Sequence, residues 1–340
     1  MAAEVNNNED ERQACIRIDP VGFQLRAPPP PHRLASYITK DGDLFQTIHM
    51  GAAVVDEDKW KLVVDGLVKQ PLVLSLEELR SLPTTMITSF HECYGSPLKP
   101  PVEALWRVGN VEWTGVRLRT ILDMVMPLPE AQYVWSDGLD YGEFAGKKAD
   151  RYQKDLPLWK AMSKEVLVAF SMNGAPLSKA RGSPVRLVVP GWFGTNSTKW
   201  LCRLSLQPCR APSLFTTQWY NEEVHSGSVV TARPVWSVDV NSVIVSPAPG
   251  AEVRGQAINV GGWAWSCEGV VEVDVGVGNA LLGASVVDRK DFGWQKFQTT
   301  LSLSPGTYKI FSRATSLNGI KQPLSGRRNH IHSVEIEVKP

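Results

Sequence analysis

Five cysteines give this sequence its widest range of possible chemistry: Cys15, Cys93, Cys202, Cys209 and Cys267. Their number is odd, their spacings are wide and no Cys-x-x-Cys pair occurs, so neither a disulfide framework nor a zinc ribbon is indicated. In a reducing compartment they are free thiols, and each free thiol is either a small buried hydrophobe or a functional thiolate. His91 and Glu92 precede Cys93 directly, but adjacent residues of a strand point to opposite faces. Three such residues in a row are therefore not a zinc signature.

A second group of residues could bind an anion. Gly194, Thr195, Asn196, Ser197 and Thr198 form a loop of small residues that can offer backbone N–H groups to a phosphate. Two cations stand near this loop in sequence, Arg186 in SPVR and Lys199 in TKW, and both adjoin apolar strands and Gly-rich turns. The guanidinium would be a fixed planar donor and the ammonium a point charge, so these two residues are predicted to bind an anionic group.

The composition places these residues in a globular protein. Hydrophobic residues make up 43% and charged residues 21% of the 340 positions, and the net charge of +1 gives no electrostatic footprint for nucleic acid or an anionic membrane. No apolar run reaches the ~18 residues that a membrane span needs. The acidic, Asn-rich start MAAEVNNNEDERQA is unlike a secretory signal or a mitochondrial presequence. We therefore expect a cytoplasmic protein with no nucleic-acid or membrane partner.

The pattern along the chain predicts two domains after a flexible tail. Residues 1–31 end in the Pro-rich RAPPPP and are interpreted as the tail. Strands are predicted within 60–68, 166–173 and 183–191, and helices within 75–83, where Ser75 and Glu78 form a capping box, and within 116–125. After about residue 233, short alternating segments separated by Gly, Pro and Asn predict an antiparallel sandwich. The catalytic domain is therefore expected at 32–235 and the sandwich at 236–340.

Four segments, in this order, resemble the sulfite oxidase superfamily. They are SFHECYGSP (89–97), NVEWTGVRLRTIL (110–122), VLVAFSMNGAPLSKARGSPVRLVVPGWFGTNSTKWLCRLSL (166–206) and a C-terminal stretch (258–323) that begins INVGGWAWS. The resemblance covers nearly everything from Leu34 onward and implies an α+β fold. A sulfite-oxidase-like mixed molybdopterin domain would be followed by an immunoglobulin-like β-sandwich that mediates a homodimer. No segment resembles the cytochrome b5-like haem domain.

The resemblance also implies a role for each site residue. Cys93 stands where the family places the thiolate ligand of molybdenum, and a soft thiolate donates charge to a metal that cycles between high oxidation states. Tyr220 lies 21 residues after Lys199 and matches the active-site tyrosine, which can hydrogen-bond an oxo ligand or relay a proton. Arg181 replaces a family histidine near the cofactor and is counted as catalytic. The molybdenum–molybdopterin cofactor would be bound by His49, Asp140 (with Asp137 as the alternative), Arg186, Ser197, Thr198 and Lys199.

The sequence departs from the family where sulfite would bind. Sulfite is a small dianion, and a desolvated anion requires paired cations. At the three positions where arginines are expected, this sequence has Thr47, Leu98 and Ser333. Replacement cations could be Lys99, Arg181, Arg327 or Arg328. Trp106 matches an aromatic residue of the substrate pocket, with a core tryptophan as the equal alternative.

These observations predict an oxidoreductase that transfers an oxygen atom in a two-electron reaction at molybdenum ligated by Cys93, with a substrate other than sulfite left open. The expected partners are a small oxyanion or oxide substrate, a second copy of the chain, and an external electron acceptor, either dioxygen or a separate redox protein. One alternative is a molybdenum reductase of S- or N-oxides, and another is a non-catalytic molybdopterin-binding protein. The presence of Tyr220 and Arg181 favours an enzyme, because a carrier needs neither.

Overall fold

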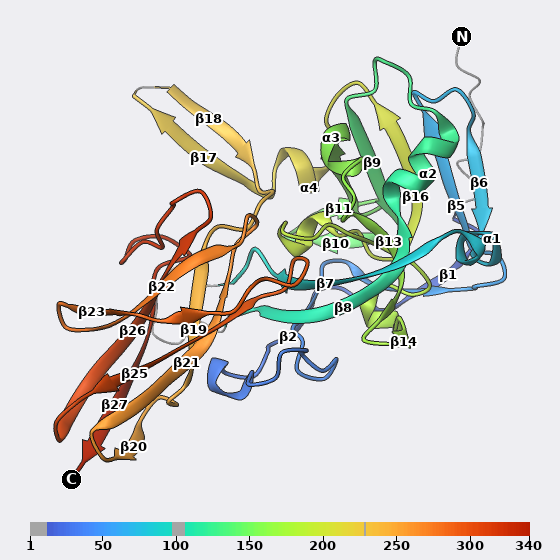
Figure 1. Cartoon of the computed structure of the whole chain (residues 1–340). Coiled ribbons are helices and arrows are strands. Elements are labelled where there is room, and N and C mark those ends of the chain that lie inside the picture. The colour runs from blue at the N-terminus through green and yellow to red at the C-terminus, as the bar shows by residue number, and fades with distance from the viewer. Residues whose placement is uncertain (1–11, 97–105, 228) are drawn as a thin grey trace. The chain divides into compact units, whose positions relative to one another are not determined.

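The computed structural model describes residues 12–96, 106–227 and 229–340, and Figure 1 traces its elements along the chain. The chain forms two compact units, each assembled from separate stretches of sequence. The first unit comprises residues 1–26, 46–87 and 112–236, and the second comprises residues 27–45, 88–111 and 237–340. This grouping differs from one boundary near residue 235, because residues 88–111, which include Cys93, group with the C-terminal part of the chain.

The first unit is organised around a five-stranded sheet in the order β12-β9-β16-β5-β6. β16 pairs with β5 in parallel and with β9 antiparallel, so it lies at the centre of the sheet. Its side chains Leu204 and Leu206 are completely buried, as are Leu62 and Val64 of β5. The strand bounds are β5 Lys61–Gly66, β6 Leu72–Ser75, β9 Tyr133–Gly138, β12 Gln153–Pro157 and β16 Leu201–Gln207.

A second sheet has the strand order β14-β13-β8-β7, and β15 also pairs with β13. The strand predicted within 166–173 is β13, and the one predicted within 183–191 is β15. β7 and β8 run from one unit into the other, because their residues 88–92 and 108–111 group with the second unit. The bounds are β7 Thr84–Glu92, β8 Val108–Arg117, β13 Leu167–Met172, β14 Ala175–Pro176 and β15 Arg186–Val188.

The α-helices of the described residues are short: α1 Leu76–Ser81, α2 Leu118–Val125, α3 Leu158–Ala161 and α4 Leu214–Thr217. The predicted capping box at α1 is confirmed, since Glu78 N donates to Ser75 Oγ at 3.2 Å and Ser75 N donates to Glu78 Oε2 at 2.8 Å. The helix predicted within 116–125 begins at Leu118, because Val116 and Arg117 continue β8 and pair with β13. No helix of the described chain is both long enough and apolar enough to cross a membrane.

The segment expected to be a tail contains regular structure and needs correction. β1 (Cys15–Val21) pairs with β4 (Gly51–Val55), and β2 (Gln24–Arg26) pairs with β3 (Gln46–Ile48). The prolines after Arg26 exclude a long helix but do not prevent pairing of the alternating residues before them. The remaining elements of the first unit are β10 Gly142–Phe144, β11 Lys147–Ala149, β17 Asn221–Ser226, β18 Val229–Pro234, η2 Lys179–Arg181 and η3 Gly194–Asn196.

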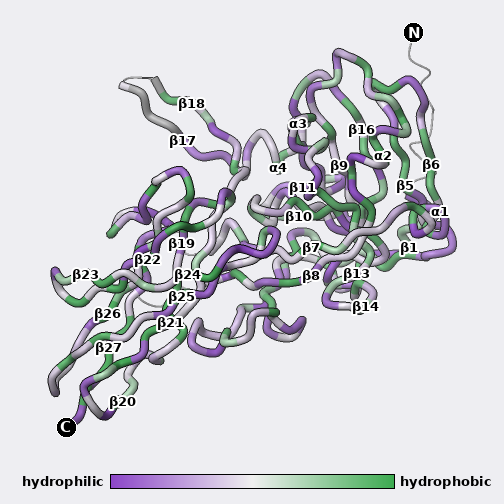
Figure 2. Tube along the Cα trace, in the orientation of Figure 1, coloured by the Kyte–Doolittle hydropathy of each residue, from purple (hydrophilic) through white to green (hydrophobic). Residues whose placement is uncertain are grey.

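The second unit contains the predicted immunoglobulin-like sandwich. One sheet has the order β19-β21-β25-β24 and the other β20-β27-β26-β22-β23, and hydropathy changes sign repeatedly along these strands (Figure 2). Inward side chains of both sheets form one apolar core that includes Ile244, Val273, Phe297, Ile310 and Ala314. The bounds are η1 Pro31–Arg33, β19 Asn241–Ser246, β20 Ala251–Arg254, β21 Ala257–Trp265, β22 Val270–Val277, β23 Ala280–Gly283, β24 Ser285–Val286, β25 Gln295–Ser302, β26 Gly306–Ser316 and β27 His332–Lys339. A mostly-β chain with few helices is the result.

Candidate functional site

The first unit buries a guanidinium among carbonyl groups. Arg186, the first residue of β15, is 2% exposed and donates from Nη1 to Arg181 O and from Nη2 to Ser197 O, both at 3.1 Å. Its guanidinium carbon also lies 4.9 Å from the ring centroid of Trp113. Burial, with a smaller contribution from the charge of Arg181, lowers the pKa of Arg186 to about 9. Within the described chain no carboxylate contacts this guanidinium, so an anionic ligand would complete the site.

The loop predicted to bind an anion folds as η3 and is tied to its surroundings. Tyr152 Oη donates to Thr195 O at 2.7 Å, which holds the loop against β12. Ser197 Oγ accepts from Val189 N at 3.1 Å, and Thr198 Oγ1 shares a hydrogen bond with Ser136 Oγ at 2.7 Å. Both hydroxyls predicted to contact the cofactor are therefore buried and already bonded within the protein.

Lys199 and Asp140 come together next to this loop. Lys199 Nζ donates to Thr47 O at 2.9 Å. Gly182 has φ +96°, and a Cβ built there would lie 2.6 Å from Lys199 Cβ, so a side chain at position 182 would displace the lysine. Asp140 is 3% exposed, and its Oδ1 has no hydrogen-bond partner among the described residues. Burial raises the pKa of Asp140 to about 7. This buried acceptor fits an N–H donor of a pterin ring.

The structure separates Asp140 from its alternative. Asp137 Oδ2 pairs with Arg151 Nη1 at 2.8 Å, and Asp137 Oδ1 accepts from Gln153 Nε2 at 2.8 Å. Because both carboxylate oxygens of Asp137 are bonded while Asp140 Oδ1 is not, Asp140 is the better candidate for a cofactor contact.

His49 and Tyr220 meet inside an aromatic cluster. His49 Nε2 hydrogen-bonds Tyr220 Oη, and the imidazole is surrounded by aromatic rings at centroid distances between 4.8 and 6.5 Å, those of Phe23, Phe144, Tyr152, Phe215 and Tyr220. Burial first, then the charges of Lys199 and Lys154, lowers the pKa of His49 to about 3. The imidazole is therefore neutral near pH 7. Tyr220 has φ +60°, an unusual backbone conformation for a residue with a side chain and one that recurs at functional sites.

A buried lysine beneath Tyr220 was missed by the sequence analysis. Lys154 on β12 is 0% exposed, donates from Nζ to Phe215 O at 2.9 Å, and lies 5.4 Å from the Tyr220 ring centroid. Burial lowers the pKa of Lys154 to about 7. The neighbouring Asp155 is paired with Arg210 at 3.1 Å. The only available signal was a charged residue inside the strand-like run YQKDLP.

In the second unit, Cys93 begins a tight turn immediately after β7. Ser96 N donates to Cys93 O at 2.9 Å, and Cys93 N donates to Arg107 O at 2.9 Å. The thiol is half-buried, and its Sγ lies 3.4 Å from Gly95 N and 3.9 Å from Arg107 Nη1. N–H donors therefore face the sulfur, an arrangement suited to a thiolate.

The residues beside this turn are packed against the sandwich. Glu92 is 3% exposed and accepts from Trp265 Nε1 at 2.7 Å. Burial raises the pKa of Glu92 to about 7, and the positive charge of Arg328 opposes that rise. Trp106 is 5% exposed and lies edge-on to Trp265 at 6.3 Å between centroids. Trp106 is thus part of the packing around the Cys93 turn. Across the described chain, no three His, Cys, Asp or Glu side chains cluster as metal ligands.

The positions tied to substrate charge have different fates. Thr47 and Ser333 lie on β3 and β27, whereas Leu98 and Lys99 fall outside the described residues. Arg181 is buried at the end of η2. Arg327 is exposed, and Arg328 contacts the backbone of the Cys93 turn.

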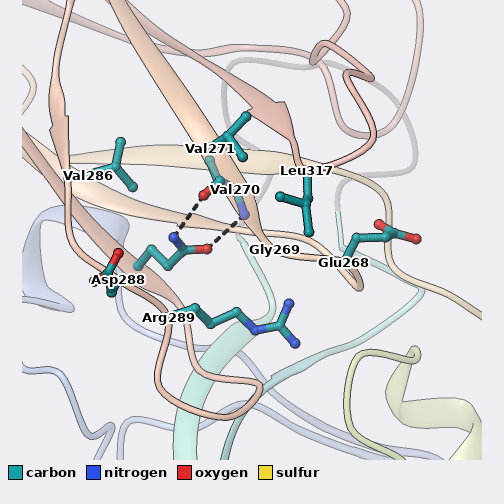
Figure 3. A pocket seen from close by; sticks show the side chains of 9 residues that line it. Glu268, Gly269, Val270, Val271, Val286, Asp288, Arg289 and Leu317 are labelled. Atoms are coloured by element: carbon teal, nitrogen blue, oxygen red, sulfur yellow. Dashed lines mark hydrogen bonds between the residues drawn. The ribbon is translucent and has the colours of Figure 1, made fainter.

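A separate pocket opens on the sandwich (Figure 3). Its charged lining consists of Glu268, Asp288 and Arg289, and Gln295 beside it bonds the backbone of Val270 in both directions. None of the lining residues is among those to which the sequence assigns chemistry.

Comparison with known proteins agrees with this geometry. The family described as "Oxidoreductase molybdopterin binding domain" matches residues 49–215. Sulfite oxidase of Gallus gallus is 31% identical over 337 residues, which cover 88% of this chain and 72% of that protein. Mitochondrial sulfite oxidase of Homo sapiens is 31% identical over 84% of this chain, but the match spans 57% of that protein's length.

A solved structure gives the same result at the level of the fold. The sulfane dehydrogenase SoxCD from Paracoccus pantotrophus superposes with a TM-score of 0.80 at 27% identity, covering 95% of this chain and 86% of that chain. Sequence similarity over most of the chain, the matched cofactor domain and the fold all point the same way. The chain belongs to the sulfite oxidase family of molybdopterin oxidoreductases.

Proposed function

We propose that this protein oxidises a small sulfur compound by two-electron oxygen-atom transfer, with a molybdenum–molybdopterin cofactor bound through Cys93. Arg186 is the observation that carries the proposal. Its guanidinium is buried among carbonyl oxygens, with no carboxylate beside it in the described chain. A buried charge of this kind is unfavourable unless it meets an anion, and the phosphate of a molybdopterin is such an anion.

The residues of the first unit suit the other end of the cofactor equally well. Lys199 adds a second cation, and Asp140 offers an unpartnered buried oxygen to a ring N–H donor. When bound, the cofactor supplies a metal that exchanges two electrons and an oxygen atom with the substrate. The Cys93 thiolate would donate charge to that metal, and the adjacent N–H donors would moderate the donation.

Proton handling would fall to Tyr220. Its phenol bonds to His49, which is neutral near pH 7 and can therefore accept a hydrogen bond through Nε2. The surrounding aromatic rings limit the access of water, so a proton released near the phenol would leave through this pair. Lys154 supports the Tyr220 ring from below and would fix its position rather than react.

The substrate is proposed to carry less charge than sulfite. Thr47 and Ser333 offer neutral hydrogen bonds where the family resemblance leads us to expect arginines. The similarity to a protein named sulfane dehydrogenase supports a sulfur compound other than sulfite. The same neutral positions favour reduction of an S- or N-oxide as the second candidate.

The decisive experiment combines cofactor analysis with a turnover screen. Purified protein should contain about one molybdenum and one pterin per chain. It should oxidise a sulfur compound with ferricyanide as acceptor more efficiently than it reduces S-oxides, N-oxides or nitrate with a reduced viologen. Protein that carries the cofactor but turns over none of these would support a non-catalytic molybdopterin-binding protein instead.

Assembly and location complete the proposal. We propose a cytoplasmic homodimer formed through the sandwich of residues 236–340, with dioxygen or a separate redox protein as electron acceptor. Light scattering at working concentration should give twice the chain mass, and a monomer would remove the dimer from the proposal.

A further inference from the structure

Two arginines contact the turn Cys93–Ser96, and their contacts differ in kind. Arg328 serves the backbone of the turn: its Nη2 donates to Tyr94 O and, at 2.9 Å, to Ser96 O. Its guanidinium carbon lies 3.9 Å from the centroid of the Tyr94 ring. Arg328 thus holds the shape of the turn, and its charge lies close enough to buried Glu92 to offset it.

Arg107 faces the sulfur instead. Its backbone N donates to Ser96 Oγ at 2.9 Å, which fixes the start of β8 against the turn, and its Nη1 lies 3.9 Å from Cys93 Sγ. A Cβ at position 95 would lie 2.6 Å from Arg107 Nη1 and 3.2 Å from its guanidinium carbon, so glycine leaves room for the cation over the turn. Within the described chain, Cys93 Sγ is the one acceptor that the Arg107 guanidinium contacts.

We propose that Arg107 is the residue that recognises the charge of the substrate, and that it selects a singly charged oxyanion over a doubly charged one. The inference rests on the proposed function, because it places the reacting group at the Cys93 sulfur. A group attached to that sulfur lies next to the guanidinium, and one guanidinium matches one anionic group in charge and in planar, two-donor geometry.

The selectivity follows from counting the charges near the turn. Arg328 is occupied by the turn and by Glu92, while Thr47 and Ser333 are neutral. A monoanion such as a sulfonate or sulfinate would therefore find one full counter-charge. A dianion would enter with its second charge uncompensated, which disfavours binding in a site shielded from water.

The first test measures the charge at Cys93 without any enzyme activity. Full-length protein from a host that lacks molybdopterin is alkylated with iodoacetate, a monoanion, and with neutral iodoacetamide, and each cysteine is followed by mass spectrometry. The ratio of the two rates cancels the thiolate fraction and reports the attraction of an anion. At low salt we expect the ratio at Cys93 to exceed that of N-acetylcysteine amide about threefold to tenfold.

Variants locate the source of that attraction. Arg107→Gln should lower the ratio at Cys93 to that of N-acetylcysteine amide, and Arg107→Lys should keep most of it. Arg327→Gln removes the same charge from an exposed neighbour of Arg328 and should change nothing. The ratio at exposed Cys209 serves as the internal reference. An equal ratio for wild-type Cys93 and the free thiol would overturn the inference even if Arg107→Gln failed to fold, as would an equal drop for Arg327→Gln.

The second test uses the cofactor-loaded protein. Methanesulfonate, with one charge, should compete with the oxidised substrate more strongly than sulfate, with two. Arg107→Gln should raise the inhibition constant of methanesulfonate about tenfold and raise KM more than it lowers kcat. Unchanged inhibition in Arg107→Gln contradicts the inference, whereas absence of molybdenum from the wild type contradicts the proposed function and leaves the alkylation result standing.

Discussion

Replacing Lys154 with methionine should flatten the dependence of stability on pH above neutrality. The ammonium is completely buried, and its hydrogen bond goes to a carbonyl, Phe215 O, rather than to a carboxylate. Burial lowers its pKa from 10.5 to about 7. Between these two values the unfolded chain binds a proton that the folded chain does not, so the free energy of unfolding rises with pH in that window. Below about pH 7 both states are protonated and the lysine adds no further slope.

The magnitude follows from the width of the window. A fully developed difference of one proton changes the free energy of unfolding by ~1.4 kcal/mol per pH unit. Between pH 7 and pH 9 the wild type should therefore gain about 2 kcal/mol from this residue, and Lys154→Met should gain none of it. The absolute stability of the variant is less informative, because methionine also leaves Phe215 O without its donor, at a cost of ~1–3 kcal/mol.

Urea unfolding of the cofactor-free protein at pH 7, 8 and 9 measures this slope directly. Lys61→Met serves as the matched control, because it removes one lysine from an exposed position on β5. The difference between the wild type and Lys154→Met should grow with pH, while the difference between the wild type and Lys61→Met stays constant. Parallel pH profiles for the wild type and Lys154→Met would show that the amine is not buried as the structure places it.

Three further outcomes are expected. Cys93→Ser exchanges a soft thiolate for a hard hydroxyl and should abolish turnover with an unchanged circular dichroism spectrum; full activity would make the ligand assignment wrong. Arg186→Met should lower molybdenum per chain at least tenfold, since removing one partner of a desolvated charge pair costs ~3–5 kcal/mol, and normal occupancy by metal analysis would contradict this. Sulfite should saturate the enzyme only at high concentration, and Thr47→Arg should lower its KM in steady-state assays; a near-micromolar KM in the wild type would refute the charge argument.

The parts of the fold that follow from local rules were predictable from the sequence. The capping box of α1 depends on Ser75 and Glu78 alone, and both bonds are present. The alternating segments after residue 236 predict strands because each must bury one face. β1 was missed because its partner, β4, is distant in sequence, and a strand at the edge of a polar, Pro-rich region has no local signature.

The charged residues divide in the same way. Arg186 and Lys199 were recognised because they lie within motifs, but Lys154 and Arg107 were not. Lys154 is defined by a carbonyl 61 residues away and Arg107 by a sulfur 14 residues away. Such pairs depend on how the turns close, which a single sequence does not reveal.

The sandwich has a second role besides the proposed dimer contact. Phe90 N donates to Phe292 O, Glu92 accepts from Trp265, and Arg328 bonds the turn that follows. Every one of these partners lies beyond residue 237 in sequence, so the segment that carries Cys93 is shaped by the C-terminal part of the chain. The metal ligand therefore depends on the sandwich for its position, and a change in the sandwich core can alter the metal site without touching a cofactor-binding residue.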